Sequence, residues 1–115
     1  MKHSEARKIC FLTGTRAEYG LLSGLIQKVK KNKSFNLDLI VTGTHLSSEY
    51  GKTIDFIYKD KVKISRKIDI SLNKNSRLGV SKSLSIAIEK ISRNLNNLKP
   101  DLLVLLGDRY ETFAA

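Results

Sequence analysis

The chain has 115 residues, of which 41% are hydrophobic and 28% are charged, a composition typical of one small globular domain and not of a disordered chain. Its formal net charge of +10 invites comparison with nucleic-acid-binding proteins. The lysines are scattered, however, and their densest run, residues 28–33, falls where a helix is expected to end, a position that favours cations. We therefore expect the positive field to attract an anionic nucleotide, and we expect neither a nucleic-acid nor a membrane partner.

Cysteine and histidine usage excludes several classes of site. The single cysteine, Cys10, lies in an apolar run and is interpreted as a buried small hydrophobe, not as a nucleophile or a disulfide partner. One cysteine and two distant histidines form no metal-binding pattern, and no glycine-rich motif typical of NAD or ATP binding is present. The polar N-terminus leads into no signal-peptide core or membrane-spanning stretch, so we expect a cytoplasmic protein without cofactors.

Apolar runs and helical periodicities alternate along the first half of the chain. The run Ile9–Leu12 predicts a buried strand, and residues 17–31 predict a helix whose apolar positions recur at helical spacing. A second strand is predicted at residues 37–41, and a second helix at about residues 48–58. The apolar positions of the first helix are Tyr19, Leu22, Ile26 and Val29, and those of the second are Ile54, Ile57 and Tyr58.

The second half continues this alternation. Residues 62–70 alternate apolar and polar side chains, which favours an extended segment. Residues 78–98 carry the clearest helical pattern, which Pro100 ends. Residues 102–106 form a fourth apolar run, which predicts a fourth strand, and residues 111–115 predict the beginning of another helix. Because no further helix follows to cover this last strand, we expect it to leave apolar surface exposed. The apolar positions of the long helix are Leu84, Ile88, Ile91, Leu95 and Leu98.

Strands that alternate with helices indicate βαβ units and a parallel sheet. We therefore predict an α/β, Rossmann-like fold with flanking helices, in which residues 1–115 form a single domain. Four strands without a closing helix make an incomplete doubly wound domain. We accordingly expect the chain to be a truncated N-terminal domain that lacks the second domain of its protein.

Three predicted loops follow the carboxyl ends of strands, where open parallel sheets bind their ligands. The loops at residues 13–16, 42–45 and 107–109 each combine a glycine, which lets the backbone approach a ligand closely, with a charged or titratable side chain. These loops predict a binding site. Its candidate residues are Arg16, His45, Asp108 and Arg109.

Each candidate residue also has a structural interpretation. Arg16 beside a helix N-terminus suits a diphosphate, and its position after a strand favours this interpretation over that of a solvated arginine. Asp108 follows an apolar run, where partial desolvation would favour proton transfer, and it is also a suitable N-cap for the next helix. For His45 the structural and ligand-binding interpretations have equal weight. Glu18 is interpreted as a cap of the first helix turn and Tyr19 as a core contact.

The same loops carry three motifs in the order and spacing of a known family. From about residue 9 to its last residue, the chain resembles the hydrolysing UDP-N-acetylglucosamine 2-epimerases, most of all the branch that opens sialic acid and related nonulosonic acid synthesis. The motifs are Gly14-Thr15-Arg16-Ala17-Glu18-Tyr19, Thr42-Gly43-Thr44-His45-Leu46-Ser47 with Tyr50-Gly51-Lys52-Thr53 close behind, and Gly107-Asp108-Arg109-Tyr110-Glu111.

The resemblance implies a glycosyltransferase-B-like (GT-B-like) enzyme of two Rossmann-like domains with a UDP-sugar between them. Enzymes of this family eliminate UDP from UDP-N-acetylglucosamine through an unsaturated glycal, and water then adds with inversion at C2 to give N-acetylmannosamine. Neither NAD nor a metal is implied. By motif match, Arg16 and Arg109 would contact the diphosphate, His45 would line the sugar side, and Asp108 would be an acid/base carboxylate. We also expect the complete enzyme to be a homo-oligomer.

The chain departs from some relatives at Leu106, which stands where they carry a histidine, and the other family carboxylates would lie beyond Ala115. We therefore expect the chain alone to be inactive. Three alternatives stay open: a non-catalytic nucleotide-binding module, the nucleotide-sugar-binding half of a GT-B glycosyltransferase, and a basic RNA-binding domain. A steep salt dependence of RNA affinity would favour the last of these.

Overall fold

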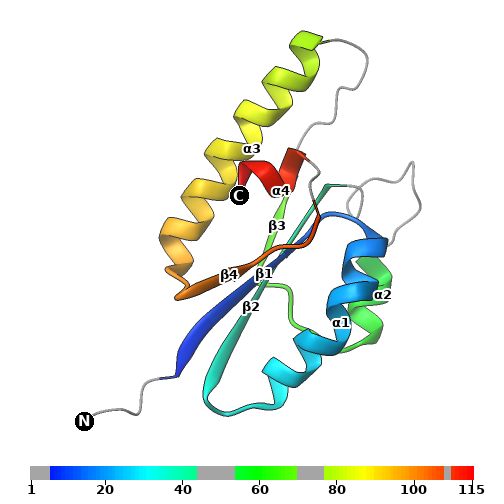
Figure 1. The fold of residues 1–115 in the computed structure, drawn as a ribbon, viewed down its shortest axis with the longest axis vertical. Coiled ribbons are helices and arrows are strands. Elements are labelled where there is room, and N and C mark those ends of the chain that lie inside the picture. Colours follow the sequence, from blue (N-terminus) through cyan, green and yellow to red (C-terminus); the bar gives the residue numbers. More distant parts are fainter. Residues whose placement is uncertain (1–5, 44–53, 70–76, 108–109) are drawn as a thin grey trace.

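The computed structural model describes residues 6–43, 54–69, 77–107 and 110–115, in which strands and helices alternate along the chain (Figure 1). This alternation confirms the predicted α/β fold. The strands are β1 (Arg7–Thr13), β2 (Phe35–Thr42), β3 (Arg66–Ile68) and β4 (Leu102–Val104), and the helices are α1 (Arg16–Lys31), α2 (Ile54–Lys59), α3 (Arg77–Leu98) and α4 (Tyr110–Ala114).

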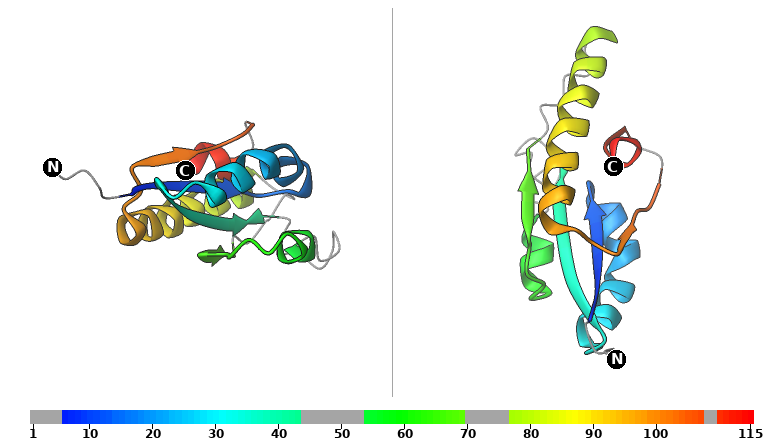
Figure 2. Two further views of the ribbon diagram at one scale, coloured as in Figure 1. Left: turned by 90° about the horizontal axis from the view of Figure 1, so that it is seen from below. Right: turned by 90° about the vertical axis from the view of Figure 1, so that its left-hand side faces the viewer.

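The strands form one parallel sheet in the order β3-β2-β1-β4. Helices α1 and α2 cover one face of the sheet, whereas α3 and α4 cover the other (Figure 2). Because all the strands run in the same direction, their carboxyl ends lie at the same edge of the sheet. The predicted parallel sheet with flanking helices is therefore confirmed.

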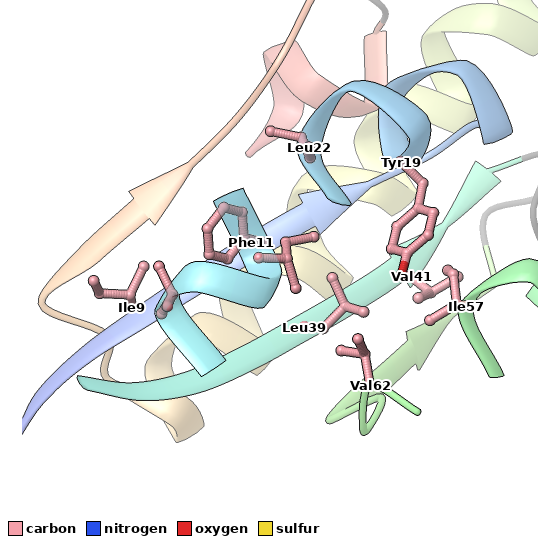
Figure 3. Packing of buried hydrophobic residues seen from close by; sticks show 10 residues of the cluster. Ile9, Phe11, Tyr19, Leu22, Leu39, Val41, Ile57 and Val62 are labelled. Carbon is pink, nitrogen blue, oxygen red and sulfur yellow. The ribbon is translucent and has the colours of Figure 1, made fainter. Parts of the chain in front are cut away.

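The apolar core has two halves, one on each face of the sheet. In β1, Ile9 and Phe11 pack toward α1, whereas Cys10 and Leu12 pack toward α3, which explains why the whole run is apolar. Figure 3 shows the first half, between the sheet and α1 and α2. Its buried members are Ile9, Phe11, Tyr19, Leu22, Ile26, Val29, Leu39, Val41, Ile57 and Val62; those of the second half are Cys10, Leu12, Ile40, Ile68, Ala87 and Ile91.

The buried faces of α1 and of the central strands agree with the sequence pattern. All four apolar positions predicted for α1 are buried, and the helix ends in a turn with Lys28, Lys30 and Lys31, as expected of cations near a helix C-terminus. Cys10 is fully buried, and burial together with the nearby charge of Asp38 raises the pKa of its thiol to about 12. The thiol is therefore protonated at neutral pH, and the predicted burial of Cys10 is confirmed.

Two helix faces differ from the prediction. In α3, Ile88 is exposed, and the buried positions before Ile91 are the small residues Ser83 and Ala87, four residues apart. Ala87 belongs to the core half between α3 and the sheet, against which Ala114 and Ala115 at the end of the chain also pack. In α2, Ile57 is buried but Tyr58 is half exposed, and the part of this predicted helix before residue 54 lies outside the described residues.

The fourth strand also differs from the prediction. The strand covers only residues Leu102–Val104 (β4). Among the described strands β4 is at the edge of the sheet, with β1 as its one neighbour. The strand predicted at residues 102–106 was therefore too long, because residues 105 and 106 lie outside β4. Leu102 is 56% exposed and Leu105 is 36% exposed, in agreement with the expected exposure of apolar surface on this strand. The extended segment at residues 62–70 is a strand only at β3, and Ile70 lies outside the described residues. None of the helices in the described part of the chain has the length and apolarity needed to cross a membrane.

Tyr19 connects α1 to the segment after α2, because its hydroxyl donates a hydrogen bond of 2.6 Å to the Asp60 carboxylate. Tyr19→Phe removes this bond and is expected to lower the free energy of unfolding by about 1–2 kcal/mol. Tyr58→Phe also removes a tyrosine hydroxyl, here from a half-exposed ring, and is expected to change the free energy of unfolding by less than about 0.5 kcal/mol. Urea unfolding of both variants measures the two values, and equal values would contradict this role of Asp60.

Candidate functional site

The candidate site lies at the edge of the sheet where the parallel strands end. The described residues there are the turn 13–15 after β1, Gly43 after β2 and residues 105–107 after β4. Gly43 has a φ of 65° and Gly107 a φ of 89°, in the left-handed region that side chains disfavour. Glycine is therefore favoured at both strand ends.

The turn between β1 and α1 is held by its own side chains. Thr15 has an extended backbone and acts as the N-cap of α1, where its hydroxyl oxygen accepts a 3.1 Å hydrogen bond from the backbone N–H of Glu18. Thr13 donates its hydroxyl to the carbonyl of Thr15 at 3.2 Å. Glu18 in turn accepts a 2.8 Å hydrogen bond from the N–H of Gly14. The beginning of α1 is thus fixed by the motif that the sequence singled out.

Arg16 is the first residue of α1 and is exposed, so the structure places it directly after the turn that follows β1, as predicted. Its guanidinium lies 4.1 Å from the centre of the Phe56 ring in α2, a cation–π contact. Two N–H groups of the adjoining turn, those of Gly14 and Glu18, already have protein partners. Arg16 is therefore an exposed cation beside the end of β1.

Glu18 is more than the cap that the sequence predicted. It is 8% exposed, and of the described residues it is the one buried side chain with a formal charge. A Cβ built on Gly107 would lie 3.4 Å from its Oε2 atom, so the carboxylate also faces the loop after β4. The capping-box spacing from Thr15 to Glu18 is a sequence signal that could have located the helix start. It could not have indicated the proximity of Glu18 to a loop so distant in the sequence.

Of the four predicted site residues, Arg16 is the one that lies within the described residues. His45, Asp108 and Arg109 lie outside the described residues, so their predicted positions are not tested here. The glycines that precede them, Gly43 and Gly107, lie at the same edge of the sheet as the Arg16 turn. Within the described ranges, no three or more histidine, cysteine or acidic residues come together as a possible metal site.

Comparison with known proteins connects this strand-end geometry to a family. A family model described as UDP-N-acetylglucosamine 2-epimerase matches residues 27–115, which is more than half of the chain. The chain belongs to this family. Within the UDP-N-acetylglucosamine 2-epimerase family, its relatives include GDP/UDP-N,N'-diacetylbacillosamine 2-epimerase (hydrolyzing) of Campylobacter jejuni, with 44% identity over 105 residues. Polysialic acid biosynthesis protein P7 of Escherichia coli is 36% identical over 108 residues.

Solved structures of family members have the same fold. The structure of UDP-GlcNAc 2-epimerase from Neisseria meningitidis bound to UDP-GlcNAc superposes with a TM-score of 0.72 at 21% identity, over 94% of this chain and 28% of that one. The two relatives named above match 91% and 94% of this chain, but only 27% and 28% of their own lengths. The chain therefore spans less than a third of the length of the relatives it matches.

Proposed function

We propose that this chain is the N-terminal, nucleotide-binding part of a hydrolysing UDP-N-acetylglucosamine 2-epimerase. The observation that carries the proposal is the 44% identity to a hydrolysing 2-epimerase, together with the glycine-containing strand ends and Arg16 at one edge of the sheet. In this proposal residues 1–115 form a truncated Rossmann-like domain, and a second domain completes the cleft. A cytoplasmic location and a homo-oligomeric complete enzyme belong to the same proposal.

The proposed substrate is UDP-N-acetylglucosamine or a related N-acetylated UDP-sugar. Two family members support this class by name: the Campylobacter relative is named for a diacetylated sugar, and the Neisseria structure contains UDP-GlcNAc. In the proposed reaction a base removes the C2 proton while the bond from C1 to the diphosphate breaks, which releases UDP and leaves a glycal. Water then adds its hydroxyl to C1 and a proton to C2 on the opposite face, which gives N-acetylmannosamine or its analogue.

The proposed residue roles follow the strand ends. Arg16 and Arg109 would bind the diphosphate as charge-assisted donors, and His45 would line the sugar side. Asp108 would act as one of the acid/base carboxylates. Expelling UDP while a proton leaves C2 requires opposed groups held in a cleft that excludes water. One wall of such a cleft is what the present sheet edge provides, so the chain alone is proposed to be inactive.

The reaction itself can be tested in deuterated water. The complete protein, incubated with UDP-N-acetylglucosamine, is expected to release N-acetylmannosamine with deuterium at C2, because the proton removed there is replaced from solvent. The 115-residue chain is expected to release none. NMR of the products distinguishes these results. A product without deuterium would contradict proton abstraction at C2, and transfer of the sugar to an acceptor would identify a glycosyltransferase instead.

The role of Arg16 can be tested by UDP binding. Arg16→Ala is expected to weaken the affinity of the complete protein for UDP about ten- to hundredfold, because a hydrogen bond to a charged partner contributes about 1.5–3 kcal/mol. Arg7→Ala is the matched control, since Arg7 is exposed at the opposite, amino end of β1 and its loss changes the net charge equally. The UDP affinity of both variants is measured by calorimetry. An equal loss of affinity in the two variants would show that Arg16 contributes only through the net charge of the protein.

The role of Asp108 can be tested by turnover. Asp108→Asn keeps the size and the capping ability of the side chain but removes its ability to exchange a proton. In the complete protein we expect turnover to fall at least about a hundredfold, the usual scale for loss of a general acid or base, with the fold intact by circular dichroism. Normal turnover in this variant would show that Asp108 is only a helix cap.

A further inference from the structure

Glu18 occupies a position that neither helix capping nor the proposed chemistry accounts for. A capping glutamate normally reaches back to the N–H of the N-cap residue itself. Here the carboxylate reaches one residue further, to the buried Gly14, and its second oxygen faces Gly107 in the loop after β4. One carboxylate oxygen of Glu18 is thus hydrogen-bonded to the turn after β1, and the other lies beside Gly107 in the loop after β4.

The environment of Glu18 makes this contact specific. A carboxylate that is 8% exposed is costly to bury without partners. Within the described ranges the ion pair joins Arg93 to Glu89, and no lysine or arginine there forms an ion pair with Glu18. The Gly14 N–H and the N-terminal end of α1 are the described groups that compensate its charge. The carboxylate is therefore held at one place, between the two loops.

We propose that Glu18 is a positioning residue that sets the spacing between the β1–α1 turn and the loop after β4. In this proposal the site depends on the length of the Glu18 side chain and not on its charge. The inference rests on the proposed function, because Arg16 lies two residues before Glu18 and Asp108 directly follows Gly107 in the sequence. A change in the length of this side chain would move one proposed site segment relative to the other. A displacement of about 1 Å in such a site lowers turnover up to about a hundredfold.

Two conservative variants separate reach from charge. Glu18→Asp keeps the charge at the helix N-terminus but shortens the side chain, so it no longer spans from Gly14 to Gly107. Glu18→Gln keeps the length and an oxygen that accepts the Gly14 N–H, but it removes the charge. In the complete protein we expect kcat to fall at least about tenfold in Glu18→Asp and to stay within about threefold of wild type in Glu18→Gln.

Glu89→Asp is the matched control, because Glu89 is an exposed helical glutamate on α3, and we expect it to leave kcat unchanged. A wild-type kcat in Glu18→Asp would reduce Glu18 to a helix cap and overturn the proposal. A kcat as low in Glu18→Gln as in Glu18→Asp would show that charge is required, and would overturn it too.

Hydrogen exchange reports on the same contact without any activity. In Glu18→Asp, peptides that cover residues 13–19 and residues 105–107 are both expected to exchange faster by about fivefold or more, because both loops lose a partner. Exchange unchanged after β4 would overturn the proposal. If the wild-type protein has no epimerase activity, the proposed function fails, and the exchange data still decide whether Glu18 connects the loops.

Gly107→Ala approaches the contact from the other side and serves if Glu18→Asp does not fold. The added Cβ would lie 3.4 Å from the Glu18 carboxylate, at a backbone φ of 89° that already disfavours a side chain. We expect faster exchange in the peptide of residues 13–19, although the substitution lies in the loop after β4. Faster exchange confined to the substituted loop would contradict a connection through Glu18.

Discussion

Burial of β1 on both faces is the constraint on which the rest of the structure depends. This strand lies between β2 and β4, with α1 packed on one face and α3 on the other. No polar side chain is found from Ile9 to Leu12, because each of these residues enters one half of the core or the other. Parallel pairing on both sides of β1 then brings the strand ends to one edge. The proposed site is a consequence of how the core is built.

At that edge the structure changes from apolar packing to hydrogen bonds between short loops. Thr13 and Glu18 are buried, and their side chains satisfy backbone groups of the turn that connects β1 to α1. A buried carboxylate contributes little to stability by itself, because its desolvation offsets its hydrogen bonds. The effect of the Glu18 carboxylate is geometric, since the Gly14 N–H and the loop after β4 determine its position. The turn that carries Arg16 is therefore held by the same side chain whose second carboxylate oxygen lies beside Gly107.

The elements with strong periodicity could be predicted from the sequence, and those governed by distant packing could not. The helix at residues 17–31 and its buried face follow from local spacing, and β1 and β2 from unbroken apolar runs. Ile88 was assigned to the core face of α3 because it fits the helical period, but the neighbouring Ala87 is buried against the sheet in its place. The burial of residues 102–106 depends on a neighbouring strand, which local sequence does not encode. For the site, the sequence identified the position of Arg16 but not the bridge through Glu18, because the latter joins loops far apart in the chain.

The contact of Arg16 with Phe56 also bears on how an anion would be bound. An exposed cation–π contact contributes about 0.5–1 kcal/mol, whereas a charge-assisted hydrogen bond to phosphate contributes about 1.5–3 kcal/mol. The guanidinium therefore gains by exchanging the Phe56 ring for a diphosphate, or by adding the diphosphate to it. The ring nevertheless limits the rotamers of a long side chain before any ligand arrives, which lowers the entropy lost on binding. Phe56 belongs to α2, so the packing of α2 against α1 through Ile57 and Tyr19 determines the position of the ring that the Arg16 guanidinium contacts.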